Sequence, residues 1–212
     1  MSENRVAIVT GAGRGIGRAI AIELAHAGFS LCLAARSRDQ LEETRTATAL
    51  PPERALIVLL DLASEEAPDS LIETTLEHYG RIDVLVNNAG WAPPRMPLIK
   101  TRAEDQDRMI AVNLRAPIAL TRMAAMRMTA QGSGAIVNIA SSAARKMPAG
   151  EAIYAATKAG LVAFTHASFA ELRQRFFHTG PGAGVCWTLC RIRSGVARHH
   201  GAWGQINITI GP

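Results

Sequence analysis

The 212-residue chain has little cysteine and few aromatic residues, which make up only 5% of it. Its three cysteines, Cys32, Cys186 and Cys190, are an odd and sparse set. Such a set argues against a disulfide framework and favours a reducing compartment, so we expect a cytoplasmic protein. No apolar run reaches the roughly 18 residues that a membrane span needs, and the first residues lack the pattern of a signal peptide. We therefore expect no membrane association.

Acidic residues are absent from the last 41 positions, although the whole chain carries 18 of them. The formal net charge of +5 arises entirely from this tail, because residues 172–212 hold five arginines and residues 1–171 are balanced. A basic protein that binds nucleic acid needs a binding fold around its cations. None is recognisable around these arginines, so we interpret them as a solvated basic tail and expect no nucleic-acid partner.

Short apolar, β-branched runs alternate with helical patterns along the first 176 residues. Strands that are apolar throughout and separated by helices are typical of a parallel sheet covered on both faces. Turn residues support the boundaries, with Ser37 as an N-cap and Gly80 as a C-terminal stop. The expected strands are 5–10, 30–35, 54–60, 82–86 and 135–140, and the expected helices are 15–28, 37 to before Pro51, 64–79, 101–131 and 152–176.

The pattern predicts an α/β fold, a Rossmann-like doubly wound parallel sheet in a single domain over residues 1–176. Residues 177–212 form an atypical tail, which we do not expect to be a separate domain. The tail opens with a Gly-Pro-Gly-Ala-Gly cluster at 180–184, followed by a short candidate strand at 185–189 and an edge-strand candidate at 206–210. The last strands of the fold are therefore expected to be missing or altered.

A glycine-rich turn, Thr-Gly-x-x-x-Gly-x-Gly, lies where the first strand meets the first helix. Glycine permits a tight bend and a close approach of backbone N–H groups to a pyrophosphate, which then lies at the N-terminus of the helix. The pattern alone is weak, but its place in a βαβ unit supports dinucleotide binding over a merely structural turn. The candidate binding residues here are Gly11, Arg14, Gly15, Ile16 and Gly17.

Four further motifs follow in order. They are Asn87-Asn88-Ala89-Gly90 after the fourth strand, Asn113 in the long helix, Ser141 after the fifth strand, and Tyr154-Ala155-Ala156-Thr157-Lys158 in the next helix. With the glycine turn, they make the sequence resemble the short-chain dehydrogenase/reductase family from residue 10 to residue 158. The resemblance implies an NAD(P)-dependent enzyme that interconverts a carbonyl and an alcohol on a small-molecule substrate.

The cofactor is expected to be NADP(H) rather than NAD(H). A site that prefers NAD places a carboxylate after the second strand, whereas this chain has Arg36 there and Arg14 in the turn. Arginine suits a 2′-phosphate because its planar fork forms charge-assisted bidentate hydrogen bonds. The alternative is that both arginines are solvated. By resemblance, Asp61 and Leu62 contact the adenine, while Asn88, Ala89 and Gly90 line the adenosine side and steady the sheet.

Tyr154 and Lys158 are four residues apart on a helix, so they share one face. A nearby ammonium stabilises a phenolate and so makes tyrosine a usable proton donor. By resemblance, Lys158 also binds the nicotinamide ribose beside Tyr154, and Ser141 polarises the substrate carbonyl. Ser142 is the alternative, although its side chain should point to the other face of the strand. Asn113 resembles the residue that distorts its helix and holds a water for proton supply, unless it is an ordinary helix asparagine.

Several alternatives remain open for the tail and the activity. A frame shift near residue 175 explains the abrupt change in composition, as does natural divergence. Cys186 and Cys190 with His199 and His200 resemble a zinc cluster only weakly, so no metal is expected. The alternative function is a cofactor-binding but catalytically incompetent relative that acts as an interaction partner. A homo-oligomer is expected through the two long helices, 101–131 and 152–176.

Overall fold

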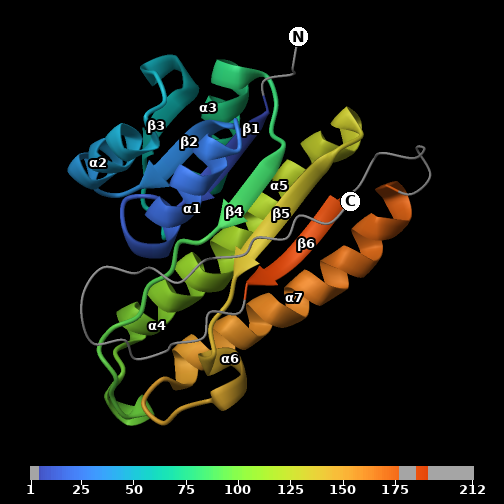
Figure 1. Cartoon of the computed structure of the whole chain (residues 1–212). Helices are drawn as coiled ribbons and strands as arrows, with labels where there is room; N and C mark the ends of the chain where they lie inside the picture. The colour runs from blue at the N-terminus through green and yellow to red at the C-terminus, as the bar shows by residue number, and fades with distance from the viewer. Residues whose placement is uncertain (1–4, 177–184, 191–212) are drawn as a thin grey trace.

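In the part of the chain that the structure describes, six parallel strands form one sheet with the order β3-β2-β1-β4-β5-β6 (Figure 1). The computed structural model describes residues 5–176 and 185–190. The predicted Rossmann-like, doubly wound parallel sheet is confirmed. The strands are β1 Val6–Thr10, β2 Ser30–Ala35, β3 Ala55–Leu59, β4 Val84–Asn87, β5 Gly134–Ile139 and β6 Val185–Cys190.

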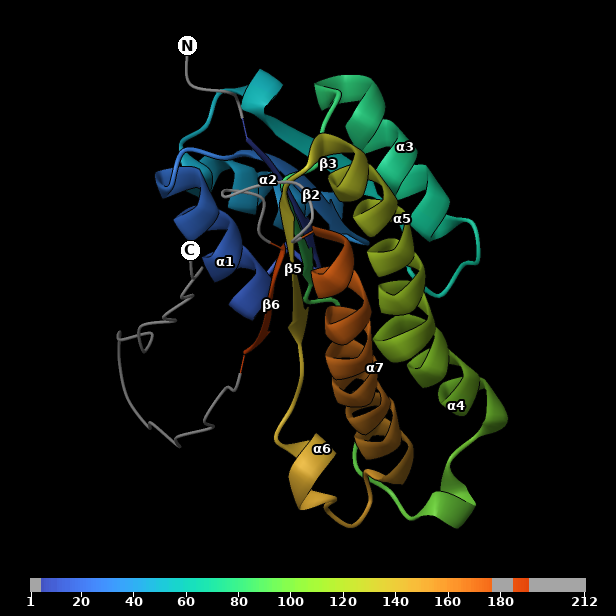
Figure 2. The same ribbon diagram turned by 90° about the vertical axis from the view of Figure 1, so that its right-hand side faces the viewer.

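Helices cover both faces of the sheet. Seen edge-on, α1 lies on one side, while α3, α4, α5 and α7 lie on the other (Figure 2). The helices are α1 Gly15–His26, α2 Arg38–Thr48, α3 Ala67–Tyr79, α4 Ala103–Ile110, α5 Ala116–Gln131, α6 Ala143–Lys146 and α7 Ala152–Phe176, with 3-10 turns at Pro52–Arg54 and Leu98–Lys100 and a π-helical segment at Ala111–Arg115.

The alternation of side chains along β1 builds two hydrophobic cores. Ala7 and Val9 pack on the side of α1 and α2, whereas Ile8 packs on the side of α3 and α5. All three side chains are fully buried. Burying one Ile or Val side chain stabilises a fold by about 1.5–3 kcal/mol. Because both faces of the strand are buried, its sequence is apolar throughout instead of alternating with polar residues.

Local signals set most of the helix boundaries. The Ser37 hydroxyl accepts a hydrogen bond from the Gln40 amide at the start of α2, as expected of an N-cap. Gly80 ends α3 with a φ of 75°. That helix begins at Ala67 rather than at residue 64, since Ser64 lies in the preceding turn. The helical stretch predicted over 101–131 is present from Ala103 to Gln131, and a π-helical segment joins α4 to α5 within it.

The strand considered at 185–189 is confirmed as β6, which pairs in parallel with β5 from Gly134 to Ile139. The edge-strand candidate at 206–210 lies outside the described residues. So do the side chains of Cys186, Cys190, His199 and His200 that resembled a zinc cluster. Among the side chains that are described, no group of three or more His, Cys, Asp or Glu residues could hold a metal ion.

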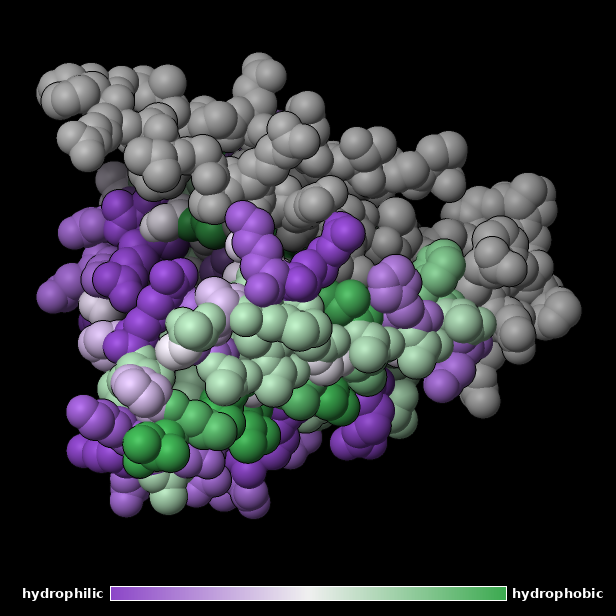
Figure 3. Space-filling view, turned by 90° about the horizontal axis from the view of Figure 1, so that it is seen from below, coloured by the Kyte–Doolittle hydropathy of each residue, from purple (hydrophilic) through white to green (hydrophobic). Residues whose placement is uncertain are grey.

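Part of the surface is apolar. Seen from below, hydrophobic residues form a continuous band (Figure 3). Large exposed apolar side chains include Ile110 at the end of α4 and Ile118 and Met126 on α5, which are 46%, 37% and 63% exposed. In the described part of the chain, none of the helices combines the length and apolar character needed to cross a membrane.

Replacing Asp83 with alanine is expected to destabilise the fold by about 2–3 kcal/mol, because it leaves a buried backbone donor without its acceptor. The Asp83 carboxylate accepts a hydrogen bond from the Val6 amide at 2.8 Å and pairs with Arg81 at the same distance. Urea unfolding followed by circular dichroism would measure the change. The exposed Asp107→Asn is the control, and equal stability of the two variants would contradict the prediction.

Candidate functional site

The candidate site lies where the order of the sheet reverses, between β1 and β4. Ligands of doubly wound sheets bind at this switch point, beyond the carboxyl ends of the strands. The Thr10 hydroxyl donates to the Val86 carbonyl at 3.1 Å and accepts from the Asn88 and Ala89 amides at 3.0 Å each. The Asn88 side chain donates in return to the Thr10 and Gly11 carbonyls. The two loops after β1 and β4 are therefore clamped together.

Close packing explains the glycines of the turn. A Cβ atom on Gly17 would lie 2.2 Å from the Gly11 carbonyl oxygen, and one on Gly11 would lie 2.9 Å from the Ala89 Cα. Gly15 is different, because a Cβ there would meet nothing within 4 Å, although its φ of +57° favours glycine. Gly11 and Gly17 thus bring the strand, the helix and the next loop together, while Gly15 faces open space.

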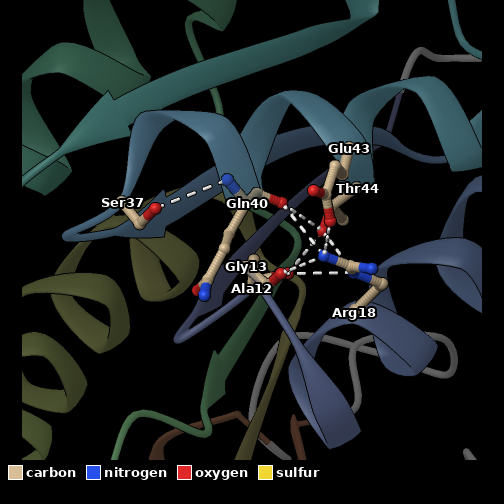
Figure 4. A network of polar contacts seen from close by, with 7 residues as sticks. All are labelled: Ala12, Gly13, Arg18, Ser37, Gln40, Glu43 and Thr44. Carbon is tan, nitrogen blue, oxygen red and sulfur yellow. Dashed lines mark hydrogen bonds and ion pairs between the residues drawn. The ribbon is translucent and has the colours of Figure 1, made fainter.

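The outer side of the turn is held by Thr44 of α2 and by Arg18 of α1 (Figure 4). The Thr44 hydroxyl donates to the Ala12 carbonyl at 2.9 Å, and the Arg18 guanidinium donates to the Gly13 carbonyl at 2.6 Å. Arg18 also pairs with Glu43 at 2.7 Å. These contacts within the protein hold the turn in place. Neither Arg18 nor Thr44 was among the residues predicted from the sequence.

A first cavity of about 540 Å³ opens over this turn. It brings together most of the predicted cofactor-binding residues, from four separate loops. The predicted residues that line it are Gly11, Arg14, Gly15, Ile16, Arg36, Asp61, Leu62, Asn88, Ala89 and Gly90. Sequence reasoning missed other lining residues, namely Gly13, Ala34, Ala35, Ser37, Gln40, Leu60, Trp91, Arg108 and Val112.

Asp61 is paired with two arginines at the edge of this cavity. Its Oδ2 atom accepts a hydrogen bond from Arg108 Nη2 at 2.6 Å, and Arg36 Nη1 lies 4.0 Å away. Partial burial raises the pKa of the Asp61 carboxyl. The Ala63 amide and the hydrogen bond and charge of Arg108 outweigh that effect, with help from Arg36, so the pKa is lowered overall. Asp61 is therefore an anion at neutral pH.

A second cavity of about 700 Å³ adjoins the first and shares four of its lining residues, Ile16, Asn88, Gly90 and Trp91. The predicted residues Ser141, Tyr154 and Lys158 all line it. They come from the loop just after β5 and from the first turns of α7, which follow each other closely in the sequence. Other lining residues that the sequence did not reveal include Ala92, Pro93, Arg95, Lys146, Pro148 and Glu151.

Lys158 is buried at the inner end of the second cavity, with 4% of its surface exposed. Its Nζ atom donates to the Ile139 carbonyl at 2.9 Å. Burial disfavours the charged form and lowers the pKa of Lys158 to about 8. The side chain is therefore still mostly protonated at neutral pH, with a buried charge close to a cavity.

Asn113 lies behind the cavities in the π-helical segment and is fully buried. Its side chain accepts from the Trp91 amide at 2.7 Å and donates to the Trp91 carbonyl at 2.8 Å. A Cβ atom on Gly90 would lie 3.5 Å from Asn113 Oδ1 and 3.6 Å from Lys158 Nζ. The helix is thus distorted at the predicted residue, and Gly90, Asn113 and Lys158 meet at one point.

Three placements differ from the sequence-based expectations or refine them. Gly17 and Asn113 are not among the described residues that line either cavity, so they support the site from behind. Ser142 lines the second cavity together with Ser141. Because β5 ends at Ile139, the alternation of side chains along that strand does not extend to these two serines.

The parallel sheet, the glycine turn and the two joined cavities define a dinucleotide-binding enzyme of the Rossmann type. The family model for short chain dehydrogenase matches residues 5–181. The chain therefore belongs to the short-chain dehydrogenase family and is an NAD(P)-dependent oxidoreductase.

Individual relatives support the same assignment. A 3-oxoacyl-[acyl-carrier-protein] reductase of Synechocystis sp. is 37% identical over 177 residues, which are 81% of this chain and 69% of the relative. A levodione reductase of Leifsonia aquatica is 33% identical over 190 residues, covering 87% and 70% of the two chains.

Two solved structures are also similar. A metagenomic short-chain oxidoreductase in complex with NADP has a TM-score of 0.81 and 36% identity, with 91% of this chain and 84% of that chain covered. An NAD⁺-bound xylitol dehydrogenase has a TM-score of 0.74 and 30% identity, with 82% and 68% covered.

Replacing Gly17 with alanine is expected to destabilise the protein by about 3 kcal/mol or more, because the new methyl group collides with the Gly11 carbonyl. It is also expected to weaken binding of the NAD(P) cofactor by about tenfold or more, since the turn must shift. Urea unfolding and fluorescence titration would measure the two effects. Gly132→Ala, at a φ of +75° with open space around it, is the control and should cost only about 1 kcal/mol.

Proposed function

We propose that the protein is an NADP(H)-dependent oxidoreductase that interconverts a carbonyl and an alcohol, with Tyr154 as the proton donor and acceptor. The observation that carries this proposal is the junction of the two cavities. The first lies over a glycine turn at a helix N-terminus, and the second is lined by Ser141, Tyr154 and Lys158. A dinucleotide that extends from one cavity into the other would bring its reactive end to these three side chains.

The residues present fit a dinucleotide. The open space beside Gly15 leaves room for a pyrophosphate at the start of α1, where backbone N–H groups are unpaired and the helix dipole favours an anion. Asp61, Leu62, Asn88 and Ala89 would hold the adenosine part. Ile16, Gly90, Tyr154 and Lys158 would lie along the nicotinamide side.

A preference for NADP(H) over NAD(H) is supported by Arg14 and Arg36, which both line the first cavity and are exposed. Their guanidinium groups would bind a 2′-phosphate bidentately. The preference rests on these two arginines, because one of the similar solved structures contains NADP and another contains NAD⁺.

The cofactor supplies the hydride when it is bound, and the chain supplies orientation and the proton. Ser141 would hold the carbonyl oxygen and polarise it. Tyr154 would give its hydroxyl proton to that oxygen during reduction and take one back during oxidation. The ammonium of Lys158, whose burial strengthens its field, would stabilise the resulting phenolate.

Asn113 would serve the proton supply as a positioning residue. Its side-chain amide forms two hydrogen bonds with the Trp91 backbone, and its Nδ2 atom lies 3.4 Å from the Thr157 hydroxyl. The π-helical distortion around it loosens the regular hydrogen bonding of the helix. A water bound there would link Lys158 to solvent.

Other expectations stay predictions. The substrate would be a small carbonyl or alcohol, and its identity is open. A homo-oligomer through the helices over 101–131 and 152–176 is supported by the exposed Ile110, Ile118 and Met126. The cytoplasmic location and the domain boundary at residue 176 also stay predictions.

Tyr154→Phe is expected to lower kcat for ketone reduction by about a hundredfold to ten-thousandfold, because the proton donor is lost. NADPH binding should stay within about threefold, since only one hydroxyl is removed. NADPH oxidation with a panel of ketones and 3-oxoacyl thioesters, beside NADPH and NADH titrations, would measure both.

The chain offers a matched control for this variant. The Tyr79 hydroxyl donates to the Leu31 carbonyl at 3.0 Å and accepts from the Leu56 amide, far from both cavities. Tyr79→Phe should lower stability and leave the activity of the folded protein unchanged. Tight NADPH binding by the wild type without turnover of any substrate would instead favour the catalytically incompetent alternative.

The value of kcat/KM for NADPH is expected to fall as the pH rises through about 8. Burial lowers the pKa of Lys158 to that value, so the side chain is charged below it and neutral above it. Loss of the proton removes the cation that binds the ribose and stabilises the phenolate. Because kcat/KM refers to the free enzyme, its pH profile would reveal this group. A flat profile from pH 6.5 to 9.5 would contradict the prediction.

A further inference from the structure

Arg108 lies on α4 at the edge of the first cavity, in a segment that carries none of the sequence motifs. Its guanidinium donates to Asp61 Oδ2 at 2.6 Å and lies 5.5 Å from the centre of the Trp91 ring. A cation over an aromatic face is attracted to it, so Trp91 helps to hold Arg108 in place. Arg108 therefore contacts two other residues that line the first cavity, Asp61 and Trp91.

Asp61 also lies 4.0 Å from Arg36, the arginine proposed to bind the 2′-phosphate. Arg108 is much closer to the same carboxylate oxygen, and its side chain is 30% exposed against 58% for Arg36. The two arginines thus compete for the Asp61 carboxylate, and Arg108 is the one hydrogen-bonded to it. The Arg36 guanidinium stays largely exposed and outside hydrogen-bonding distance of Asp61.

An unpaired Asp61 carboxylate would oppose NADP(H) binding in two ways. Its negative charge would repel the 2′-phosphate, since like charges a few ångströms apart disfavour each other even near a protein surface. It would also draw Arg36 into an ion pair and away from the phosphate. NAD(H) lacks that phosphate, so neither effect would weaken its binding as much.

We propose that Arg108 is a specificity-determining residue that favours NADP(H) over NAD(H) by neutralising Asp61 and leaving Arg36 available to the 2′-phosphate. This inference rests on the proposed preference for NADP(H). Specificity is a difference between two affinities, and here it would depend on removal of a repulsive charge as well as on an attractive contact.

The experiment compares the Kd values of NADPH and NADH, measured by fluorescence titration at low salt. In Arg108→Gln, the Kd of NADPH is expected to rise about threefold to tenfold more than that of NADH. Adding Asp61→Asn to this variant should restore the wild-type ratio of the two Kd values, because the exposed charge is then gone. In an Asp61→Asn background, Arg108→Gln should no longer change the ratio.

Arg115 provides the matched control. It follows α4 in the π-helical segment and also ties the helix to the loop after β3, through the Ala63 carbonyl at 2.9 Å and Glu65 at 2.9 Å. Among the described residues, it is not one that lines the first cavity. Arg115→Gln should therefore leave the ratio of Kd values unchanged, which separates a charge effect from loss of a structural tie.

The outcomes distinguish this inference from the proposed function. If Arg108→Gln weakens both cofactors equally, or if Asp61→Asn fails to restore the ratio, Arg108 acts only structurally and the inference is overturned. If the wild type binds NADH as tightly as NADPH, the proposed preference itself is wrong, and the inference falls with it. Should Arg108→Gln fold poorly, Arg108→Met, which keeps the apolar length of the side chain and removes its charge, should give the same shift in the ratio, and an unchanged ratio in that variant overturns the inference.

Discussion

The architecture of the site depends on the clamp between β1 and β4. The Thr10 hydroxyl at the end of β1 bonds to the backbone at the end of β4, and the Asn88 side chain returns two hydrogen bonds to the Thr10 and Gly11 carbonyls. Gly17 and Gly11 can then approach to a distance at which no Cβ atom would fit. The clamp and the cavities also share residues, since Gly11 lines the first cavity and Asn88 lines both.

Charge placement is the second constraint. The protein keeps a buried lysine beside a cavity, although burial lowers its pKa to about 8, and it pairs Asp61 with Arg108 at the cavity edge. Burying an ammonium costs stability unless hydrogen bonds or a counter-charge compensate, and strongly perturbed titratable groups in a cleft are typical of functional sites. The surface pairs around α2 and α4 contribute much less, since solvent screens them.

Much of the fold was predictable from the sequence because the signals are local. Apolar runs such as 30–35, the Ser37 cap and the Gly80 stop each depend on neighbours within a few residues. Local signals failed where the helix changes its hydrogen bonding at Ala111–Arg115, and where the single-turn helix α6 is too short to show a period. The predicted cavity residues were found through motifs, whereas Arg108, Trp91 and Arg95 belong to no motif.

The sequence by itself determined the class of sheet and the glycine turn, because each depends on local spacing along a strand or turn. Its resemblance to the short-chain dehydrogenase motifs supplied the candidates Ser141, Tyr154 and Lys158. Only the tertiary structure decided that Arg108 rather than Arg36 holds Asp61, that Gly17 and Asn113 support the cavities from behind, and that the two cavities join at Ile16, Asn88, Gly90 and Trp91. These relations connect residues tens of positions apart in the sequence. They exist only because parallel strands bring the loops at their carboxyl ends to one edge of the sheet.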